Sequence, residues 1–338
     1  MTDADVFALD DARGRCQAFG AGGQRCRNHA GPSGLCVVHD PSDEPATPPQ
    51  PLRPDGATLT ELERVIARGL ELLRRRLTGE YEIDVYGFDR ELTEQVLLPL
   101  ARPLYRLYWR VRTLGIDQVP SEGGALLVAN HAGTLPFDAI MTKVALLDEH
   151  RAHRHLRELA ADLALRLPVV GELARKTGNT LAHNDDAVRL LASGELVGVW
   201  PEGFKGIGKL YRERYQLQRF GRGGFVQVAL RAQAPIVPVA IVGSEETYPM
   251  IHNVRWLARL LGLPYFPITW QFPLLGPLGA LPLPSRWLIE FGEPIDLSSY
   301  GPADADDPLL VFELADQVRS RIQRMLDRNV AGRRSIFL

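Results

Sequence analysis

The chain has 338 residues, 45% of them hydrophobic, so it can bury a full core and is longer than a minimal single module. Its formal net charge of -2 provides no global basic field, which argues against bulk binding to nucleic acid. The first residues are acidic, and no stretch reaches the roughly 18 uninterrupted apolar residues of a membrane-spanning helix. We therefore expect a cytoplasmic protein that at most lies on the inner face of the cell membrane.

A cysteine/histidine segment occupies residues 1–40 and includes Cys16, Cys26, Cys36 and His39. Three thiolates and one imidazole suit tetrahedral zinc, and the last pair has the short spacing of structural sites. Four ligands leave no open position, so this zinc ion is expected to fold the segment and not to catalyse. The alternative is a tail with incidental cysteines.

The next segments change from linker to helical patterns. Residues 41–57 are proline-rich and predict a semi-rigid linker to a second region, residues 58–338. Its first part, residues 58–115, predicts amphipathic helices, the second of them over about 90–113. Leucine, aromatic and arginine residues interleave in this second helix, which suits a membrane surface and equally a helix packed on a sheet.

The core of the second region, residues 116–300, alternates between strand-like and helical patterns. Strands are predicted over residues 125–129, 196–200, 236–242 and 287–291. Helices are predicted over about 137–148, 157–176, 185–193 and 222–232, with a last helix over 305–330. Strands that alternate with helices predict an α/β fold with a largely parallel central sheet flanked by helices.

A histidine directly follows the first of these strands. His131 would lie at the carboxyl end of a parallel strand, where α/β folds place ligands. Asp138 begins the next helix, and a carboxylate there can hold one imidazole tautomer while the other ring nitrogen accepts a hydroxyl proton. The spacing alone fits equally well a helix-capping aspartate beside a turn histidine.

Four segments in order resemble the sequence blocks of the lysophosphatidate/glycerol-phosphate acyltransferase superfamily. They are Asn130-His131 with Asp138, then residues 178–184 (GNTLAHN), then Pro201-Glu202-Gly203, and last residues 237–240 (VPVA). Residues 220–225 also resemble the start of the helix between the third and fourth blocks. A serine hydrolase is disfavoured, because the sequence has no G-x-S-x-G nucleophile elbow.

Three of the blocks depart from the family's pattern. Six residues separate His131 from Asp138, where the family usually has four. Asn184 stands where the second block commonly has an arginine that helps to hold phosphate, and Phe204 replaces a common threonine in the third block. Either the phosphate grip is rearranged, or the acceptor is not a lysophosphatidate.

The resemblance implies acyl transfer without an enzyme nucleophile. His131, oriented by Asp138, would deprotonate a hydroxyl of a lysophospholipid or glycerol-phosphate-type acceptor, and the alkoxide would attack the thioester of acyl-CoA or acyl-carrier protein. Backbone amides near Gly203 or Gly133 are expected to stabilise the oxyanion. No cofactor is implied for catalysis.

The same resemblance implies a set of substrate-binding residues. Glu202 and Gly203 are tied to acceptor binding and to the architecture of the site, with Asn184 in the second block. Lys205 and Lys209 are expected to meet a phosphate, against the alternative of a solvated lysine loop.

A second class of function stays open at this point. In it the chain is a lipid-binding protein of the same fold, whose altered blocks have lost activity and whose zinc segment docks a partner. Two segments are candidates for contact with a membrane surface, namely the helix at 90–113 and an apolar, proline-rich stretch over 254–287. The second of these also suits the lining of an acyl groove.

Overall fold

The computed structural model describes residues 69–71 and 74–337 of a chain that divides into two units, residues 1–79 and residues 80–338. In the first unit, residues 69–71 and 74–78 are helical. The predicted zinc ligands Cys16, Cys26, Cys36 and His39 and the linker at 41–57 lie outside the described residues. Zinc binding therefore stays a prediction.

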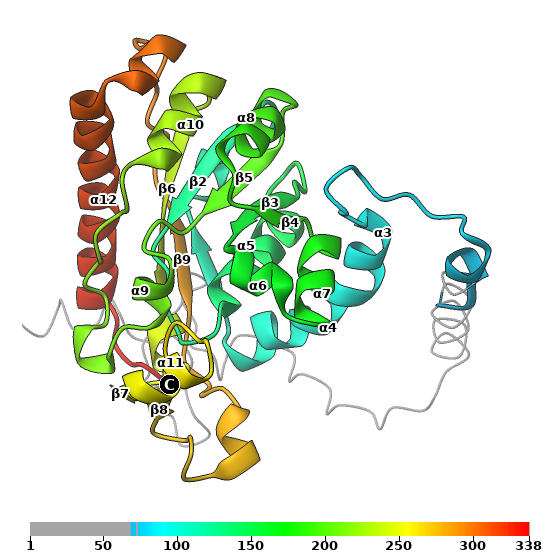
Figure 1. The fold of residues 1–338 in the computed structure, drawn as a ribbon, viewed down its shortest axis with the longest axis vertical. Coiled ribbons are helices and arrows are strands. Elements are labelled where there is room, and N and C mark those ends of the chain that lie inside the picture. Colours follow the sequence, from blue (N-terminus) through cyan, green and yellow to red (C-terminus); the bar gives the residue numbers. More distant parts are fainter. Residues whose placement is uncertain (1–68, 72–73, 338) are drawn as a thin grey trace, which may run out of the picture. The chain divides into compact units, whose positions relative to one another are not determined.

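A seven-stranded sheet in the order β1-β9-β6-β2-β5-β3-β4 forms the centre of the second unit (Figure 1). Its strands are β1 (Arg112–Leu114), β2 (Ala125–Ala129), β3 (Leu156–Ala160), β4 (Asn179–Leu181), β5 (Leu196–Val199), β6 (Ile236–Val242) and β9 (Leu288–Phe291). Neighbouring strands are parallel except β6 and β9, which pair antiparallel. The predicted, largely parallel sheet is thereby confirmed.

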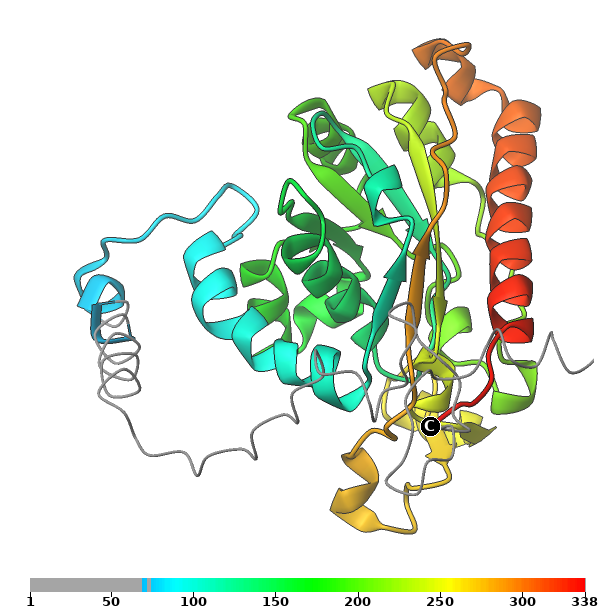
Figure 2. The same cartoon turned by 180° about the vertical axis from the view of Figure 1, so that it is seen from behind.

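Helices cover both faces of this sheet, as Figures 1 and 2 show. One face carries α8 (Asn184–Ala192), α10 (Gly224–Ala232) and α12 (Pro308–Ala331), and the other carries α5 (Phe137–Asp148) and the helical segment at 90–108. In β2, Leu126 and Val128 pack into the first layer, while Ala125, Leu127 and Ala129 pack into the second. Successive side chains point to opposite faces of a strand, so a sheet that is covered on both faces requires an unbroken apolar run.

The helix predicted over 157–176 is wrong in its first part. That part is strand β3, which is followed by α6 (Asp162–Arg166) and α7 (Val170–Lys176). Two adjacent charged residues, Arg157 and Glu158, are buried in β3. They pair with Asp84 (2.7 Å) and Lys143 (3.2 Å), which are far away in the sequence. Charged residues in a buried strand break its apolar run, and the partners that neutralise them cannot be seen in the strand's own sequence. The sequence around residues 156–160 therefore shows no strand pattern.

The helical segment predicted over 90–113 ends earlier, before strand β1. It consists of α3 (Arg90–Leu92), η1 (Thr93–Leu97), α4 (Leu98–Pro103) and η2 (Leu104–Tyr108). Tyr105 and Trp109 are buried against the sheet, and Arg102 and Arg106 both pair with Asp148 at 2.8 Å. The structure therefore supports the alternative in which this segment packs on the sheet.

A long excursion, residues 243–287, connects β6 to β9. It contains η5 (Ser244–Glu246), β7 (Met250–Asn253), α11 (Arg255–Leu260), β8 (Pro267–Thr269) and η6 (Gly276–Ala280), and β7 pairs antiparallel with β8. Shorter helices elsewhere are η3 (Ile116–Gln118), α9 (Phe204–Ile207), η4 (Tyr211–Glu213) and η7 (Pro302–Asp306). Because β6 and β2 are parallel, the excursion begins at the same edge of the sheet as the residues that follow β2.

Candidate active site

His131 and Asp138 lie in direct contact at the carboxyl end of β2. The Nδ1 atom of His131 is 2.8 Å from Oδ2 of Asp138, whose side chain is fully buried in the first turn of α5. The same carboxylate oxygen accepts the amide of Ala132 (3.0 Å). An ionised carboxylate only accepts hydrogen bonds, so it holds the proton on Nδ1 and leaves Nε2 as the basic nitrogen.

The longer spacing between the two residues is taken up by a left-handed turn. Gly133 and Thr134 both have positive φ, 102° and 64°, which is unfavourable for a β-branched residue. Hydrogen bonds hold Thr134 there: its hydroxyl donates to the Tyr248 carbonyl (3.1 Å), and its carbonyl accepts the Tyr265 hydroxyl. Both tyrosines belong to the excursion. Surrounding structure of this kind is what maintains a strained turn at a functional site.

Asn130 fixes the strand end immediately before His131. Its side-chain amide donates to the Ile241 carbonyl (3.0 Å), and its side-chain oxygen accepts the Ile241 amide (2.7 Å). The backbone register of β2 on β6 ends at Ala129 and Val239. The buried asparagine therefore extends the pairing between the strands by its side chain and sets where the histidine begins.

The third block holds the backbone of His131. One carboxylate oxygen of Glu202 accepts the His131 amide (3.0 Å), and the other accepts the Gln218 amide (2.6 Å). Gly206 packs so closely that a Cβ atom there would lie 2.6 Å from the His131 carbonyl oxygen. The amide of Gly203, at φ 54°, donates to the Trp200 carbonyl (3.0 Å) and is therefore already used.

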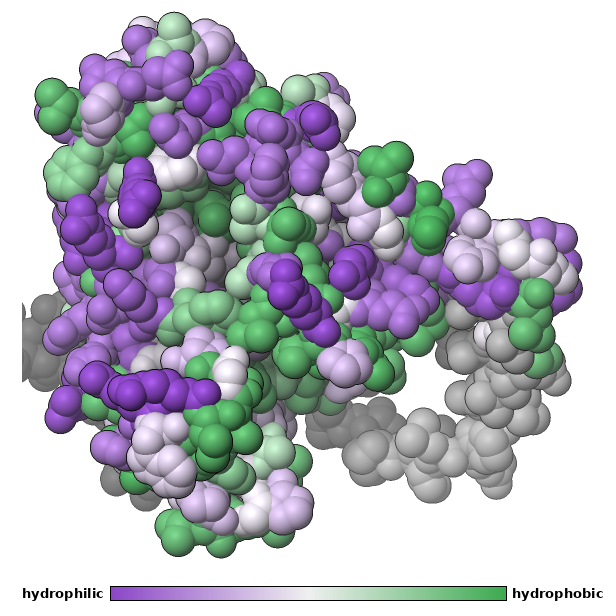
Figure 3. Space-filling model, viewed as in Figure 1, coloured by the Kyte–Doolittle hydropathy of each residue, from purple (hydrophilic) through white to green (hydrophobic). Residues whose placement is uncertain are grey.

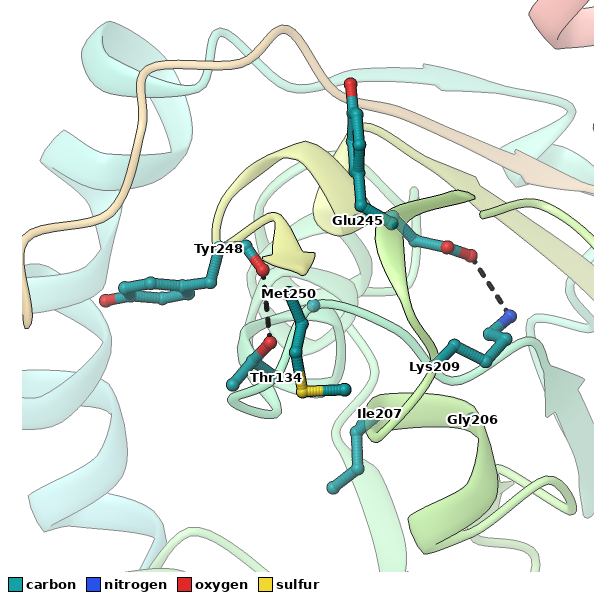
Figure 4. Close-up of a pocket in the computed structure, with 9 residues that line it drawn as sticks. Thr134, Gly206, Ile207, Lys209, Glu245, Tyr248 and Met250 are labelled. Atoms are coloured by element: carbon teal, nitrogen blue, oxygen red, sulfur yellow. Dashed lines mark hydrogen bonds and ion pairs between the residues drawn. The ribbon is translucent and has the colours of Figure 1, made fainter. Parts of the chain in front are cut away.

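Lys209, which was predicted to meet a phosphate, lines both cavities of the site, and its ammonium is paired with two glutamates. Its ammonium lies 3.4 Å from Glu202 and 3.1 Å from Glu245, and its side chain is only 3% exposed. Figure 4 draws the contact with Glu245. Burial opposes its charge, but the two carboxylates raise the pKa of Lys209 above its ordinary value. A lysine neutralised in this way supports the site from inside.

Glu245 shares this single cation with Glu202. Burial raises the pKa of Glu245 to about 7, against the opposing effect of Lys209. Two buried carboxylates beside one ammonium carry an excess negative charge, so the cluster tends to hold one proton near neutral pH.

The second block contacts α5 through Asn179, the first residue of β4. Lys143 on α5 donates to the Asn179 side chain and to the Thr177 carbonyl (2.8 Å), and it pairs with the buried Glu158 at 3.2 Å. These contacts tie α5, the helix that carries Asp138, to the far strands of the sheet.

An open cleft with a volume of about 280 Å³ lies beside the third block. Phe204, Lys205, Tyr265 and Asn253 are among the residues that line it. Lys205 is exposed, so its charge is available to a ligand in the cleft. A second cavity of about 10 Å³ has room for about one water molecule, and Gly133 is one of the residues that line it. Figure 4 draws the lining residues of this cavity, among them Thr134, Lys209 and Glu245.

Asn184 is exposed at the start of α8, which follows the edge strand β4. Its side-chain oxygen lies near Gly224, the first residue of α10, since a Cβ atom on Gly224 would be 3.9 Å from it. Asn184 is not among the residues that line either cavity.

Sequence reasoning missed Glu245, Tyr248 and Tyr265. For Glu245 a signal was present, because two adjacent glutamates follow the apolar strand β6 after just two intervening residues. The tyrosines lie in the irregular excursion, where no local pattern indicates which side chains turn back toward the site. Among residues 69–71 and 74–337, no group of three or more His, Cys, Asp or Glu residues is arranged to hold a metal ion.

The chain is similar in sequence and in structure to several known proteins. A solved structure of a 1-acyl-sn-glycerophosphate (LPA) acyltransferase, PlsC, from Thermotoga maritima is similar at a TM-score of 0.47 and 18% identity, over 82% of this chain and 94% of that one. A Bos taurus protein named "DGAT1/2-independent enzyme synthesizing storage lipids" is 25% identical over 64% of this chain and 58% of its own.

Two further matches are a relative that aligns over nearly the whole chain and a family model that covers the four blocks. An uncharacterized protein of Mycobacterium tuberculosis is 50% identical over 99% of this chain and 98% of its own length. Residues 110–242, which contain all four blocks, match the family model described as Acyltransferase. Residues 110–242 therefore form a domain that matches the acyltransferase family, and the whole chain belongs to one family with the uncharacterized mycobacterial protein.

Proposed function

We propose that the protein transfers a fatty acyl group from acyl-CoA or acyl-carrier protein to a hydroxyl of a lysophospholipid or glycerol-phosphate-type acceptor. The observation that carries this proposal is the 2.8 Å contact between His131 and the buried Asp138. It pairs a base with an orienting carboxylate at the ligand-binding edge of the sheet. The match of residues 110–242 to the acyltransferase family model supports acyl transfer in lipid synthesis.

In the proposed reaction, Nε2 of His131 takes the proton of the acceptor hydroxyl while its oxygen attacks the thioester carbonyl carbon. The carbon–sulfur bond then breaks, and the imidazolium returns the proton to the leaving thiolate. The products are an ester and a free thiol. Asp138 keeps the imidazole in the required tautomer and stabilises the imidazolium that forms.

Two further groups are assigned roles in this proposal. Because the Gly203 amide donates to Trp200, the amide of Gly133 is the one assigned to the oxyanion. Lys205 provides a positive charge in the cleft that suits an anionic headgroup, since Lys209 is neutralised by two glutamates. Catalysis needs no cofactor in this scheme, and the zinc predicted for Cys16, Cys26, Cys36 and His39 would be structural.

A thiol-release assay with one acyl-CoA and a panel of lysophospholipid acceptors tests the proposal. His131→Ala should lower the rate by roughly 10²–10⁴, the range expected for loss of a general base. Asp138→Asn should lower it by up to about 10⁴, because the amide favours the wrong tautomer. His183→Ala is the matched control, since this histidine is 59% exposed in the second block, and it should retain activity.

Near wild-type turnover by folded His131→Ala protein would overturn the assignment of the base. Binding of a labelled lysophospholipid by the wild-type protein without any thiol release would favour the lipid-binding alternative. Loss of zinc from full-length protein on Cys26→Ser substitution would support the metal segment. Absence of zinc from wild-type protein would remove that prediction.

The location follows from the substrates in this proposal. Acyl chains and the acceptor partition into a bilayer, so the enzyme is proposed to act as a peripheral protein on the inner face of the cell membrane. In the part of the chain that the structure describes, no helix is both long enough and apolar enough to cross a membrane.

A further inference from the structure

The excursion has an unusual charge composition. Residues 247–289 include no aspartate or glutamate, although about one residue in eight is acidic across the chain. The basic residues Arg255 and Arg259 lie within this stretch on α11, and both are exposed. The surface of the excursion is therefore cationic without internal compensation.

The same stretch exposes large apolar side chains. Trp256 is 68% exposed, Leu260 74%, Trp270 55% and Leu274 85%. Figure 3 shows apolar surface at the lower end of the molecule, where Figure 1 places α11, β7 and β8. Exposed tryptophan and leucine beside uncompensated arginine are the composition of a surface that lies in the membrane interface.

This surface borders the cleft. Asn253, Pro264 and Tyr265 of the excursion line it, and the excursion leaves the sheet at the edge where His131 lies. A second apolar surface follows β3 at the same end of the strands, since Val169 before α7 is 71% exposed and Val170 at the start of α7 is 53% exposed. Apolar surface therefore lies on both sides of the strand end that carries the histidine.

We propose that the apolar face of the excursion docks on an anionic lipid bilayer, so that the cleft opens toward the membrane. The proposal deepens the proposed function, because it names the surface from which a lipid acceptor would enter. Arginines attract the anionic headgroups, and the exposed tryptophans and leucines enter the boundary between headgroups and acyl chains. A second copy of the chain is the competing occupant, and it has the same uncompensated positive charge on this face.

Sedimentation with vesicles of phosphatidylcholine and phosphatidylglycerol at 7:3 tests the proposal on full-length protein. The double variant Trp256→Ala/Leu260→Ala should bind roughly tenfold or more weakly, because two large apolar side chains are lost from the contact. The double variant Arg255→Gln/Arg259→Gln should lose roughly fivefold per arginine on these vesicles. It should show no such loss on pure phosphatidylcholine. Trp270 remains in both variants as a fluorescence reporter that brominated lipids should quench.

The matched control is Leu309→Ala/Phe312→Ala on α12. These side chains are also a leucine and an aromatic residue, 77% and 60% exposed. They lie at the other end of the strands, away from His131, because β9 runs antiparallel to β6 before the chain enters α12 (Figure 1). This variant should bind vesicles as the wild type does.

Equal vesicle binding by the Trp256→Ala/Leu260→Ala variant, called the α11 variant from here on, and the α12 control would overturn the proposal. A wild-type dimer that the α11 variant converts to monomer, without vesicle binding by either, would overturn it in favour of the second copy. Vesicle binding is measured without turnover, so an inactive wild-type protein that still binds through α11 would refute the proposed function and leave the docking surface standing.

Discussion

Replacing Lys209 by methionine removes the one cation between two buried carboxylates. Glu202 and Glu245 lie 3.4 Å and 3.1 Å from its ammonium, and both are buried. Removing one partner of a buried ion pair costs about 3–5 kcal/mol, because the remaining charge has neither water nor a counter-ion. Glu245, with a pKa of about 7, takes up a proton readily near neutral pH, so the cost falls mainly on Glu202. We expect a loss of about 4 kcal/mol of unfolding free energy.

Thermal denaturation measures this loss directly. A domain of about this size loses roughly 2–4 °C of Tm per kcal/mol, so Lys209→Met should unfold roughly 8–16 °C below the wild type. Glu202 accepts the backbone amide of His131, so acyl transfer should also fall in protein that is still folded at the assay temperature.

Lys205→Met is the matched control for this experiment. Lys205 lies on the same segment but is exposed in the cleft, so its substitution should change stability by no more than about 0.5 kcal/mol. It should instead weaken binding of an anionic acceptor. An equal change in Tm for the two variants would refute the assignment of Lys209 to the interior of the site.

Three further substitutions test other parts of the site. Glu245→Gln removes a carboxyl whose pKa rises from 4.5 to about 7 on folding, so the wild type loses stability as pH rises through this window and the variant does not. Its Tm relative to the wild type should rise between pH 5 and pH 8, by an amount equivalent to about 3 kcal/mol; a constant difference would contradict the shift. Gly133→Ala puts a Cβ atom 2.6 Å from a backbone oxygen at φ 102° and should lower turnover at least about tenfold, whereas Gly262→Ala, also left-handed but in open space, should leave turnover intact. Asn130→Leu leaves both buried backbone groups of Ile241 unpaired and should cost about 2–4 kcal/mol in urea unfolding; an unchanged midpoint would show that the pairing is dispensable.

The parts of the fold that sequence reasoning predicted are those whose pattern is local. Strands β2 and β6 are unbroken apolar runs, and the bounds predicted for them, 125–129 and 236–242, are those of the structure. Helix α5 likewise has the predicted bounds, 137–148. Strand β3 was missed because the partners of Arg157 and Glu158 come from distant segments.

The same distinction applies to the site. His131 and Asp138 were predictable, because one follows a strand and the other begins a helix at the ligand-binding edge. Lys205 and Lys209 lie on one short segment, and the sequence has no local sign that one is exposed and the other buried. Lys209 is buried because it pairs with Glu245, which lies on η5 after β6. Contacts between separate strand ends are a property of the folded sheet and not of any single block.

The excursion is also a loop whose ends meet. Val242 and Leu288 are paired across β6 and β9, and the Leu283 amide donates to the Thr247 carbonyl (2.9 Å). Residues 248–282 therefore start and finish at one point, and loops closed in this way tolerate changes of length at small entropic cost. The sheet with its histidine and aspartate is therefore structurally separate from a closed loop that borders the cleft. Grafting a different loop at Thr247 and Leu283, with the two tyrosine contacts retained, would change the surroundings of the cleft without moving a strand of the sheet.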